Sequence, residues 1–338
     1  MPPHPETWLR VTESGLFCEP GGFFVDPLRP VDRAVITHAH ADHARPGHNH
    51  VLGTAETLAI MRVRMGEDRA GLTQQALRYG TSLNINGVRL WLRPAGHVLG
   101  SAQVCLEWQG SRVVVSGDYK RRADATCAPF EPERCDVFIT EATFALPVFT
   151  HPPAEREIAR LLRSVALFPE RTHVIGCYAL GKAQRLISLL RESGWDQPIP
   201  LHGALMKLCT LYEEFGVPLG ALVPATIAAK GKLSAHIVLA PPSAIADRWA
   251  RRLVDPIPCL ASGWMRVRQR ARQGSAELPM VISDHADWPE LLATCTEVEA
   301  GEVWVTHGRE EALIHALGQR GIRGRALHLV GRGDGEED

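Results

Sequence analysis

Short apolar runs alternate with amphipathic segments along most of this chain. The short runs have the length and boundaries of buried strands. These predicted strands are residues 23–25, 33–37, 88–92, 102–107, 112–116, 136–140, 173–176, 237–239, 280–283 and 302–306. Apolar residues with helical spacing predict helices at residues 55–65, 154–167, 182–192, 205–215 and 310–317. This alternation predicts an α/β protein with layered sheets.

Histidines and acidic residues recur directly after these apolar runs or in a short loop beside them. The stretch ITHAHADHARPG, residues 36–47, follows one predicted strand and is the densest case. The same placement is found for Asp26, His97, Asp118, Glu141, His285, Asp287 and His307. Each residue alone is more simply interpreted as a capping aspartate or a packed histidine. Because a sheet holds its strand ends rigidly, the whole set favours a metal site.

The cluster in ITHAHADHARPG has the residue types and the spacing of a metal-binding loop. A tight loop after a strand can turn His38 and His40 toward one cation, and Asp42 and His43 toward a second. Imidazole nitrogen and carboxylate oxygen are ligands that Zn²⁺ favours, at about 2.0–2.2 Å. Two metals about 3.5–4 Å apart stabilise both the attacking and the leaving oxygen of a hydrolysis. No cysteine is among the candidate ligands, so zinc is favoured, with manganese or iron as alternatives.

The H-x-H-x-D-H spacing at residues 38–43, with a later lone histidine and a Gly-Asp pair after a strand, resembles the metallo-β-lactamase fold. This resemblance implies an αββα sandwich that carries two metals at the edges of its sheets. It implies that one zinc is bound by His38, His40 and His97. It also implies that the other zinc is bound by Asp42 and His43, and that Asp118 bridges the two ions. Asp26 would support these ligands without binding metal itself.

Three later segments resemble motifs A, B and C of the β-CASP nucleases. They are Glu141 in ITEATF, His285 in ISDHAD and His307 in VTHG. In that group an extra α/β domain is inserted between motifs A and B, and CYALGKAQRL (177–186) resembles the segment that opens it. The resemblance implies that His307 completes the ligands of the second zinc and that Glu141 orients His285. It also implies that a metal-activated hydroxide attacks a phosphodiester, with Asp26, Asp42, Glu141 and His285 serving catalysis.

The motif positions imply the domain organisation. We expect a metallo-β-lactamase core built from residues 1–144 and 283–338, with a β-CASP insertion at residues 145–282. Several stretches, among them LAPPSA (239–244) and ASGWMRVR (261–268), are similar to the bacterial ligase-associated DNA exonucleases. That similarity implies a zinc-dependent exodeoxyribonuclease that acts on free DNA ends in repair. It also implies a functional association with an ATP-dependent DNA ligase and a helicase.

Three alternative functions are considered. An RNA-processing nuclease stays open, because RNA-acting relatives carry the motif C histidine whereas eukaryotic DNA-acting relatives usually lack it. A non-catalytic nucleic-acid-binding scaffold is disfavoured, because every metal ligand and all three motifs are intact. A small-molecule hydrolase is disfavoured by the insertion and by a segment rich in arginine and tryptophan.

That segment bears on the choice of substrate. Seven arginines lie between positions 248 and 272, interleaved with Trp249 and Trp264, and a basic run at 120–122 follows Asp118. Arginine forks suit phosphates and indoles can stack on unpaired bases, although a solvated helix face with packed tryptophans is the simpler alternative. The predicted nucleic-acid contacts are Lys120, Lys182, Ser243, Ser262, Trp264, Arg266, Arg268 and Arg270.

Composition adds limits to this interpretation. The 338 residues are 45% hydrophobic, which is enough for sizeable cores, and the formal net charge of -1 leaves nucleic acid open as a partner. The amino terminus lacks the apolar segment of a signal peptide and no stretch approaches 18 apolar residues, so we expect a soluble, cytoplasmic protein without membrane contact. Eight cysteines without a C-x-x-C pair indicate neither a zinc ribbon nor a disulfide framework.

Overall fold

The computed structural model describes residues 1–227, 237–274 and 276–327. The chain divides into two compact units. The first combines Met1–Phe149 with His285–Asp338, and the second is Thr150–Asp284. The first unit is therefore discontinuous in sequence, and its return segment begins at a predicted site residue, His285.

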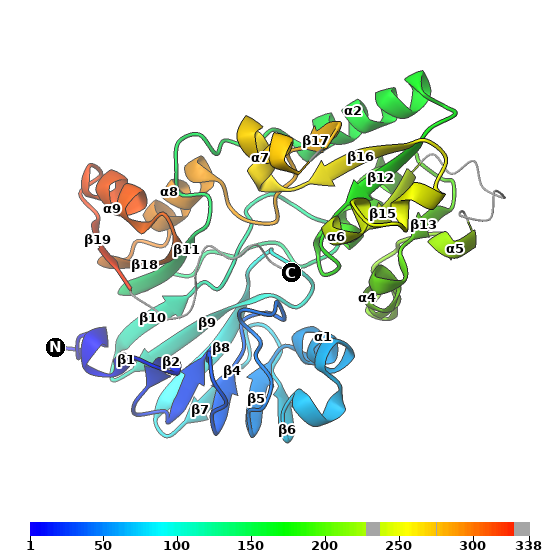
Figure 1. The fold of residues 1–338 in the computed structure, drawn as a ribbon. Helices are drawn as coiled ribbons and strands as arrows, with labels where there is room; N and C mark the ends of the chain where they lie inside the picture. Colours follow the sequence, from blue (N-terminus) through cyan, green and yellow to red (C-terminus); the bar gives the residue numbers. More distant parts are fainter. Residues whose placement is uncertain (228–236, 275, 328–338) are drawn as a thin grey trace. The chain divides into compact units, whose positions relative to one another are not determined.

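Within the described residues, the first unit contains two sheets (Figure 1). The six strands of one sheet follow chain order: β1 (Leu9–Thr12), β2 (Gly15–Cys18), β3 (Phe23–Val25), β4 (Arg33–Val35), β5 (His50–Gly53) and β6 (Thr73–Ala76). The other sheet has seven strands in the order β19 (Arg323–Ala326), β18 (Glu302–Gly308), β11 (Val137–Ala142), β10 (Ser111–Val115), β9 (Ala102–Trp108), β8 (Val88–Pro94) and β7 (Ser82–Ile85). Its strands β8, β10, β11 and β18 run in the same direction, so their carboxyl ends share one edge.

The central strands of the seven-stranded sheet are buried on both faces. In β11, Val137 and Ile139 join a core that also draws on β2, β3 and β4, whereas Phe138 and Ala142 join a second core with α8 (Trp288–Glu297) and α9 (Glu310–Gly318). Side chains alternate between the two faces of a strand, and a cover on both faces requires a continuous apolar run. This explains why β11 shows no apolar–polar alternation.

Two helices of the first unit, α1 and α8, begin at side-chain caps. In α1 (Ala55–Met65), the side chain of Thr54 accepts a hydrogen bond from the backbone NH of Thr57. Helix α8 begins with a capping box, in which Asp287 and Glu290 each accept a hydrogen bond from the other's backbone NH. Two short 3₁₀ helices complete the unit at Pro5–Thr7 and Glu67–Arg69. The cap at Asp287 fixes the chain two residues beyond His285.

The second unit is built on a parallel sheet. Among its described residues, the strand order is β14 (Leu222–Pro224), β13 (Ile199–Leu201), β15 (Ile237–Ala240), β12 (Thr172–Gly176), β16 (Pro256–Ala261) and β17 (Leu278–Met280). The helices are α2 (Ala154–Leu167), α3 (Lys182–Glu192), α4 (Gly203–Glu214), α5 (Ala225–Ile227), α6 (Pro242–Ile245) and α7 (Arg268–Gln273), with 3₁₀ turns at Ala250–Arg252 and Gly263–Arg266. Parallel strands joined by helices are the organisation of an α/β domain.

The mixed α/β class predicted from the sequence is confirmed by these sheets and helices. The predicted helices at 55–65, 154–167 and 182–192 coincide with α1, α2 and α3. The predicted strand 280–283 is wrong for most of its length, because β17 ends at Met280. Glu141 and His307 are each the last but one residue of a strand, β11 and β18, rather than residues that follow it.

None of the helices in the described part of the chain has the length and apolar content needed to cross a lipid bilayer.

Candidate metal centre

The centre is built where the loops after β3 and β4 meet. Asp26 follows β3 with a positive φ of 43°, an unusual conformation for a non-glycine residue. Its Oδ1 accepts a hydrogen bond from the backbone NH of Thr37 at 2.8 Å, and its Oδ2 accepts one from the Thr37 hydroxyl at 2.6 Å. These bonds hold the start of the histidine-rich loop against the end of β3.

Four buried side chains form the first group of candidate ligands. His38 and His40 come from the loop after β4, His97 from the loop after β8, and Asp118 from the loop after β10. One ligand atom from each lies within 4.8 Å of the others. His97 Nε2 is 2.9 Å from His40 Nδ1, and His38 Nε2 is 3.5 Å from Asp118 Oδ2. The predicted ligands of the first metal are therefore brought together.

A second group consists of Asp42, His43 and His307. His43 Nε2 lies 3.3 Å from Asp42 Oδ2 and 3.4 Å from Asp118 Oδ1. The rings of His43 and His307 are stacked with their centroids 5.3 Å apart. Asp118 therefore turns one oxygen toward each group, since its Oδ2 faces His38.

Glycine is required at position 117 for the loop that carries Asp118 to come close to Thr37 and the histidine-rich loop. Gly117 has a φ of 57°, and a Cβ there would lie 2.8 Å from the side chain of Thr37. A larger residue would therefore push the loop that carries Asp118 away from the loop that carries His38. The Gly-Asp pair of the sequence motif thus has a steric reason in this fold.

The donor set fits metal ions on its own chemistry. His38 Nε2 is buried and makes no hydrogen bond within the described residues. Burial is the main cause that lowers the pKa of His38 well below its usual range, with the neighbouring His43 adding to it. The ring is therefore neutral, as a metal ligand must be. Adjacent ligands of a tetrahedral ion with bonds of about 2.1 Å lie about 3.4 Å apart, close to the separations found here.

The two aspartates are held as carboxylates. Burial acts to raise the pKa of Asp118, but the nearby imidazoles of His43 and His285 outweigh it and hold that pKa well below its usual range. For Asp42, burial likewise acts to raise the pKa, and the charge and hydrogen bond of His43 reverse the effect. Both side chains are thus ionised at neutral pH, the form in which they bind cations.

Glu141 and His285 form a pair at the edge of the first group. His285 Nδ1 lies 2.9 Å from Glu141 Oε2, while the backbone NH of Tyr119 donates to Glu141 Oε1 at 2.8 Å. Burial raises the pKa of Glu141, and the charge of His285 acts against this. The His285 ring lies 4.7 Å from that of His97 between centroids. Asp118, Glu141 and His285 also form a third group of possible ligands, so proximity alone leaves the role of His285 open.

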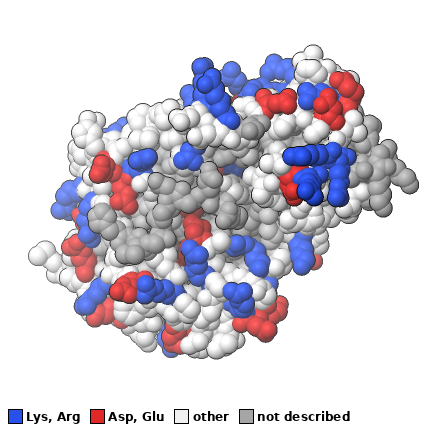
Figure 2. Space-filling model, in the orientation of Figure 1, with Lys and Arg blue, Asp and Glu red and all other residues white. Residues whose placement is uncertain are grey.

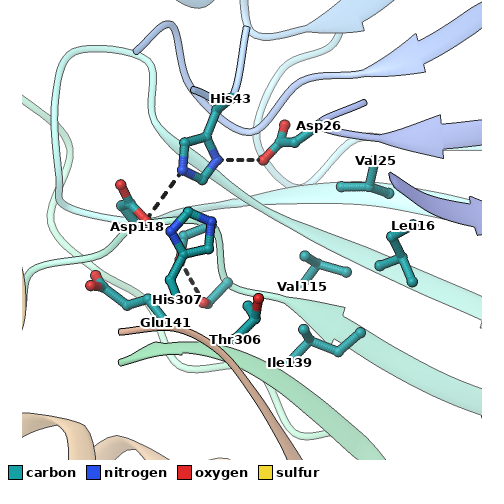
Figure 3. Close-up of a pocket in the computed structure, with 12 residues that line it drawn as sticks. Leu16, Val25, Asp26, His43, Val115, Asp118, Ile139, Glu141, Thr306 and His307 are labelled. Carbon is teal, nitrogen blue, oxygen red and sulfur yellow. Dashed lines mark hydrogen bonds and ion pairs between the residues drawn. The ribbon is translucent and has the colours of Figure 1, made fainter. Parts of the chain in front are cut away.

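A narrow pocket joins the polar centre to the core between the two sheets (Figure 3). In Figure 3 Asp26 and Asp118 lie on either side of His43, with His307 and Glu141 nearby. The apolar part of the lining comes from Leu16, Val25, Val115 and Ile139. The candidate metal ligands in this pocket therefore lie against an apolar lining.

The basic run 120–122 does not offer phosphate contacts, which corrects the prediction for Lys120. The Lys120 side chain is 1% exposed, and its ammonium pairs with Asp124. Arg121 pairs with Glu297, and Arg122 pairs with Asp287 and Glu290. These cations join parts of the first unit to one another because acidic partners lie within reach.

Lys182 requires the same correction. Its side chain is buried at the start of α3, where the ammonium donates to Ile282 O and pairs with Asp284 Oδ2, both at 2.9 Å. Arg185, one turn later, binds Asp284 Oδ1 at 3.0 Å. The ammonium of Lys182 therefore serves the internal structure of the second unit.

The remaining predicted nucleic-acid contacts lie on the second unit. Ser243 is exposed on α6, whereas Ser262 caps the following 3₁₀ turn by accepting a hydrogen bond from the backbone NH of Trp264. Trp264 is half-buried and the guanidinium of Arg270 lies 4.3 Å from its ring centroid. Arg266 and Arg268 are exposed, and Figure 2 shows basic residues gathered over α7. Cationic and aromatic groups thus share this surface.

Thr37 was missed by the sequence reasoning. It binds both oxygens of Asp26 and directly precedes His38 in the chain. A threonine at a strand end has no distinctive signal, because its partner comes from a different loop. Only the spatial meeting of the two loops identifies it.

Comparison with known proteins gives sequence relatives of two kinds. The chain is 29% identical over 328 residues to a probable DNA ligase of Opitutus terrae, a match that covers 95% of this chain and 31% of that protein. It is 33% identical over 154 residues to the endoribonuclease ysh1 of Aspergillus fumigatus, covering 42% of this chain and 17% of that protein. It is 34% identical over 152 residues to the cleavage and polyadenylation specificity factor subunit 3 of Dictyostelium discoideum, covering 42% and 19%.

The chain spans less than a third of the length of these relatives. No protein-family model matches it. A crystal structure of a protein of unknown function from Enterococcus faecalis has a similar fold, with a TM-score of 0.58 and 13% identity, over 91% of this chain and 81% of that one. The sequence relatives support the resemblance to the β-CASP-like nucleases as a group, without selecting a subgroup.

Proposed function

We propose that this chain is a two-metal nuclease that hydrolyses phosphodiester bonds. The observation that carries the proposal is the placement of Asp118, whose two oxygens face two separate groups of candidate ligands. In this proposal the first unit is a metallo-β-lactamase core, an αββα sandwich, and the second unit is a β-CASP insertion.

Each group of ligands would hold one cation, with Asp118 shared between them. His38, His40 and His97 would hold one ion, and Asp42, His43 and His307 the other. Imidazole and carboxylate donors without thiolate favour zinc, and they also suit manganese or iron. Two such ions lower the pKa of a bound water and stabilise the charge that develops on a phosphodiester during hydrolysis.

The chain's own groups orient and complete this centre. Asp26 fixes His43 through Nδ1, so that Nε2 of the ring points toward the metal positions. Glu141 holds His285 in the same manner, through Nδ1. We assign to His285 the delivery of a proton, or of a hydrogen bond, to the leaving 3′-oxygen. Groups of this kind typically contribute about 10²–10⁴ in rate.

We propose DNA with a free end as the substrate, and hence an exodeoxyribonuclease that acts in repair. The relative named as a probable DNA ligase supports this choice, because its match extends over 95% of the chain. A functional association with an ATP-dependent DNA ligase and a helicase belongs to the same proposal. The surface that holds Ser243, Trp264, Arg266, Arg268 and Arg270 would bind the strand through phosphate contacts and base stacking.

RNA is the second candidate substrate. Two relatives are named as an endoribonuclease and as a cleavage and polyadenylation factor subunit, and both match about 42% of the chain. RNA-acting relatives carry the motif C histidine, and the corresponding residue here, His307, lies in the second ligand group.

Digestion of matched DNA and RNA oligomers, labelled at either end and with or without a terminal phosphate, tests the proposal. We expect metal-dependent, stepwise shortening of DNA from one end and little cleavage of RNA. Preferential cleavage of RNA would replace the first candidate by the second. Binding without cleavage at any metal concentration would favour a non-catalytic scaffold.

A further inference from the structure

Three consecutive residues at the start of the return segment are each anchored separately. His285 pairs with Glu141, the backbone NH of Ala286 donates to Tyr119 O at 2.6 Å, and the carboxylate of Asp287 binds Arg122 at 2.9 Å. The anchors at Tyr119 and Arg122 lie in the segment that directly follows Asp118. The turn that carries His285 is thus fastened to the loop that carries the shared metal carboxylate.

Arg122 has the geometry of a clamp on this turn. Its Nη2 binds Asp287 Oδ2 and its Nε binds Glu290 Oε1, both at 2.9 Å. The other oxygens of the two carboxylates are used by the capping box of α8, because Asp287 Oδ1 accepts from Glu290 NH and Glu290 Oε2 accepts from Asp287 NH. The guanidinium of Arg122 therefore binds both residues of the capping box, Asp287 and Glu290. The Asp287 side chain is 2% exposed and that of Arg122 is 33% exposed, so the carboxylate side of the pair is shielded from solvent.

We propose that Arg122 is a positioning residue for His285. By fixing Asp287, it holds the 285–287 turn at a defined distance from Asp118, so that the imidazole faces the metal centre. The expected effect of Arg122 on kcat rests on the proposed nuclease function. The ordering of the 285–287 turn by Arg122 does not depend on that function. Arginine suits the position because its planar fork reaches two carboxylates at once, which a lysine ammonium cannot do with the same geometry.

Arg121 provides a matched control, because it lies next to Arg122 in the chain and binds the same helix, α8. It binds Glu297 at 2.6 Å and the Thr294 hydroxyl at 3.1 Å, both in the second half of α8 and away from His285. Removal of either arginine therefore deletes ion pairing between the 119–122 segment and the residues of α8 and its cap, one pair for Arg121 and two for Arg122. If Arg122 only stabilised α8, the two deletions would have the same consequences.

The experiment compares Arg122→Ala, Arg122→Lys and Arg121→Ala in the full chain. Metal content, kcat and KM are measured on an oligonucleotide, and hydrogen exchange is measured at the Ala286 amide. For Arg122→Ala we expect unchanged metal content, a KM within about threefold of the original, and a kcat lowered by up to about 10²-fold through misplacement of His285. Exchange at Ala286 should become about tenfold faster or more. Arg121→Ala should change neither kcat nor this exchange rate, and Arg122→Lys should lie between the two.

Equal Ala286 exchange in the two alanine variants would overturn the proposal, as would an Arg122→Ala variant that keeps its full kcat. Should Arg122→Ala fail to fold, Arg122→Lys decides by the same two measurements, because it retains a cation at the position. An unaltered protein without nuclease activity would refute the proposed function alone. The exchange comparison would then still decide whether Arg122 orders the turn.

Discussion

Asp26 Oδ2 lies 2.7 Å from Nδ1 of His43, and this contact directs Nε2 of the ring toward the other candidate ligands, Asp42 and Asp118. With a cation bound, a carboxylate behind Nδ1 would keep the proton on that atom, and the lone pair of Nε2, which lies on the side of Asp42 and Asp118, would bind the ion. The ring is further fixed because Thr37 anchors the same carboxylate. The orientation of one candidate ligand therefore depends on a residue that need not touch metal.

Replacement of Asp26 by alanine should weaken metal binding without removing a ligand. Outer carboxylates of this kind typically contribute about 10–100-fold to metal affinity, and we expect a loss of that size for the ion held by His43. Competition with a chromophoric chelator measures it. Asp32→Ala is the control, because Asp32 is an exposed carboxylate elsewhere in the first unit. Equal affinities of the two variants would show that Asp26 does not support the site.

Asp118→Ala should affect both metals, because its two oxygens face different ligand groups. We expect the metal content to fall from about two ions per chain to well below one. Elemental analysis of the purified variant measures this directly. Asp42→Ala is the comparison, since Asp42 belongs to one group only and its loss should spare the first ion. Full metal content in Asp118→Ala would show that Asp118 does not bridge two metal ions.

The arginine surface on the second unit should set the salt dependence of nucleic-acid binding. Each phosphate contact contributes about 0.7–0.9 to the slope of log affinity against log salt. Conversion of Arg266, Arg268 and Arg270 to glutamine should therefore lower that slope by about 2, as measured by fluorescence anisotropy with labelled single strands.

Three exposed arginines on the first unit provide the control for this measurement. They each pair with a glutamate and are Arg10, Arg29 and Arg134. Their conversion to glutamine makes the same change in net charge and should leave the slope nearly unchanged. Equal slopes for both triple variants would show that these arginines form a solvated helix face and do not contact phosphates.

His48 should contribute to the pH dependence of stability. Burial lowers its pKa below the usual 6.5, and its Nδ1 accepts a hydrogen bond from the backbone NH of Val31. The unfolded chain takes up a proton here as the pH falls through about 6.5, whereas the folded chain resists it, so stability is present above this pH and is lost below it.

His48→Asn keeps an acceptor for Val31 and removes the titrating ring. Between pH 7.5 and 5.5 the advantage of the original protein over this variant should shrink, by at most about 1.4 kcal/mol per pH unit. Denaturant unfolding at several pH values measures the difference, and the other histidines contribute equally to both proteins. Parallel stability curves would contradict a depressed pKa at His48.

The strands and the polar residues at their ends could be predicted because their local sequence patterns are strong. The runs before Asp118 and Glu141 are apolar because both faces of the seven-stranded sheet are covered. Those before Asp26 and His38 contribute Phe23, Val25 and Val35 to the first of these cores, so all four runs could be recognised from the sequence. The edge strand β6 was missed because its residues, Thr73–Ala76, are polar and solvent-facing. Helix α8 was also missed, although Asp287 and Glu290 already had the spacing of a capping box.

Partners distant in sequence were beyond such reasoning. Lys182 is predicted as an exposed cation, and only the fold brings Asp284 to it. Asp124, the partner of Lys120, lies only four positions along the chain, but the sequence does not indicate that this pair is buried. Arg122 and Asp287 are 165 positions apart, so no local pattern relates them. Charge in a sequence indicates the kind of partner that a residue needs, whereas the fold decides whether that partner is inside the protein or outside it.

In the proposed nuclease, His307 holds metal and His285 acts on the substrate. His307 belongs to the second ligand group, whereas His285 is held by Glu141 at the edge of the first. The most direct test measures metal content and turnover of an oligonucleotide in parallel for His285→Ala and His307→Ala. We expect His307→Ala to lose about one ion per chain. His285→Ala should keep both ions and turn over about 10²–10⁴-fold more slowly. Loss of metal in His285→Ala would make that residue a ligand and contradict the account.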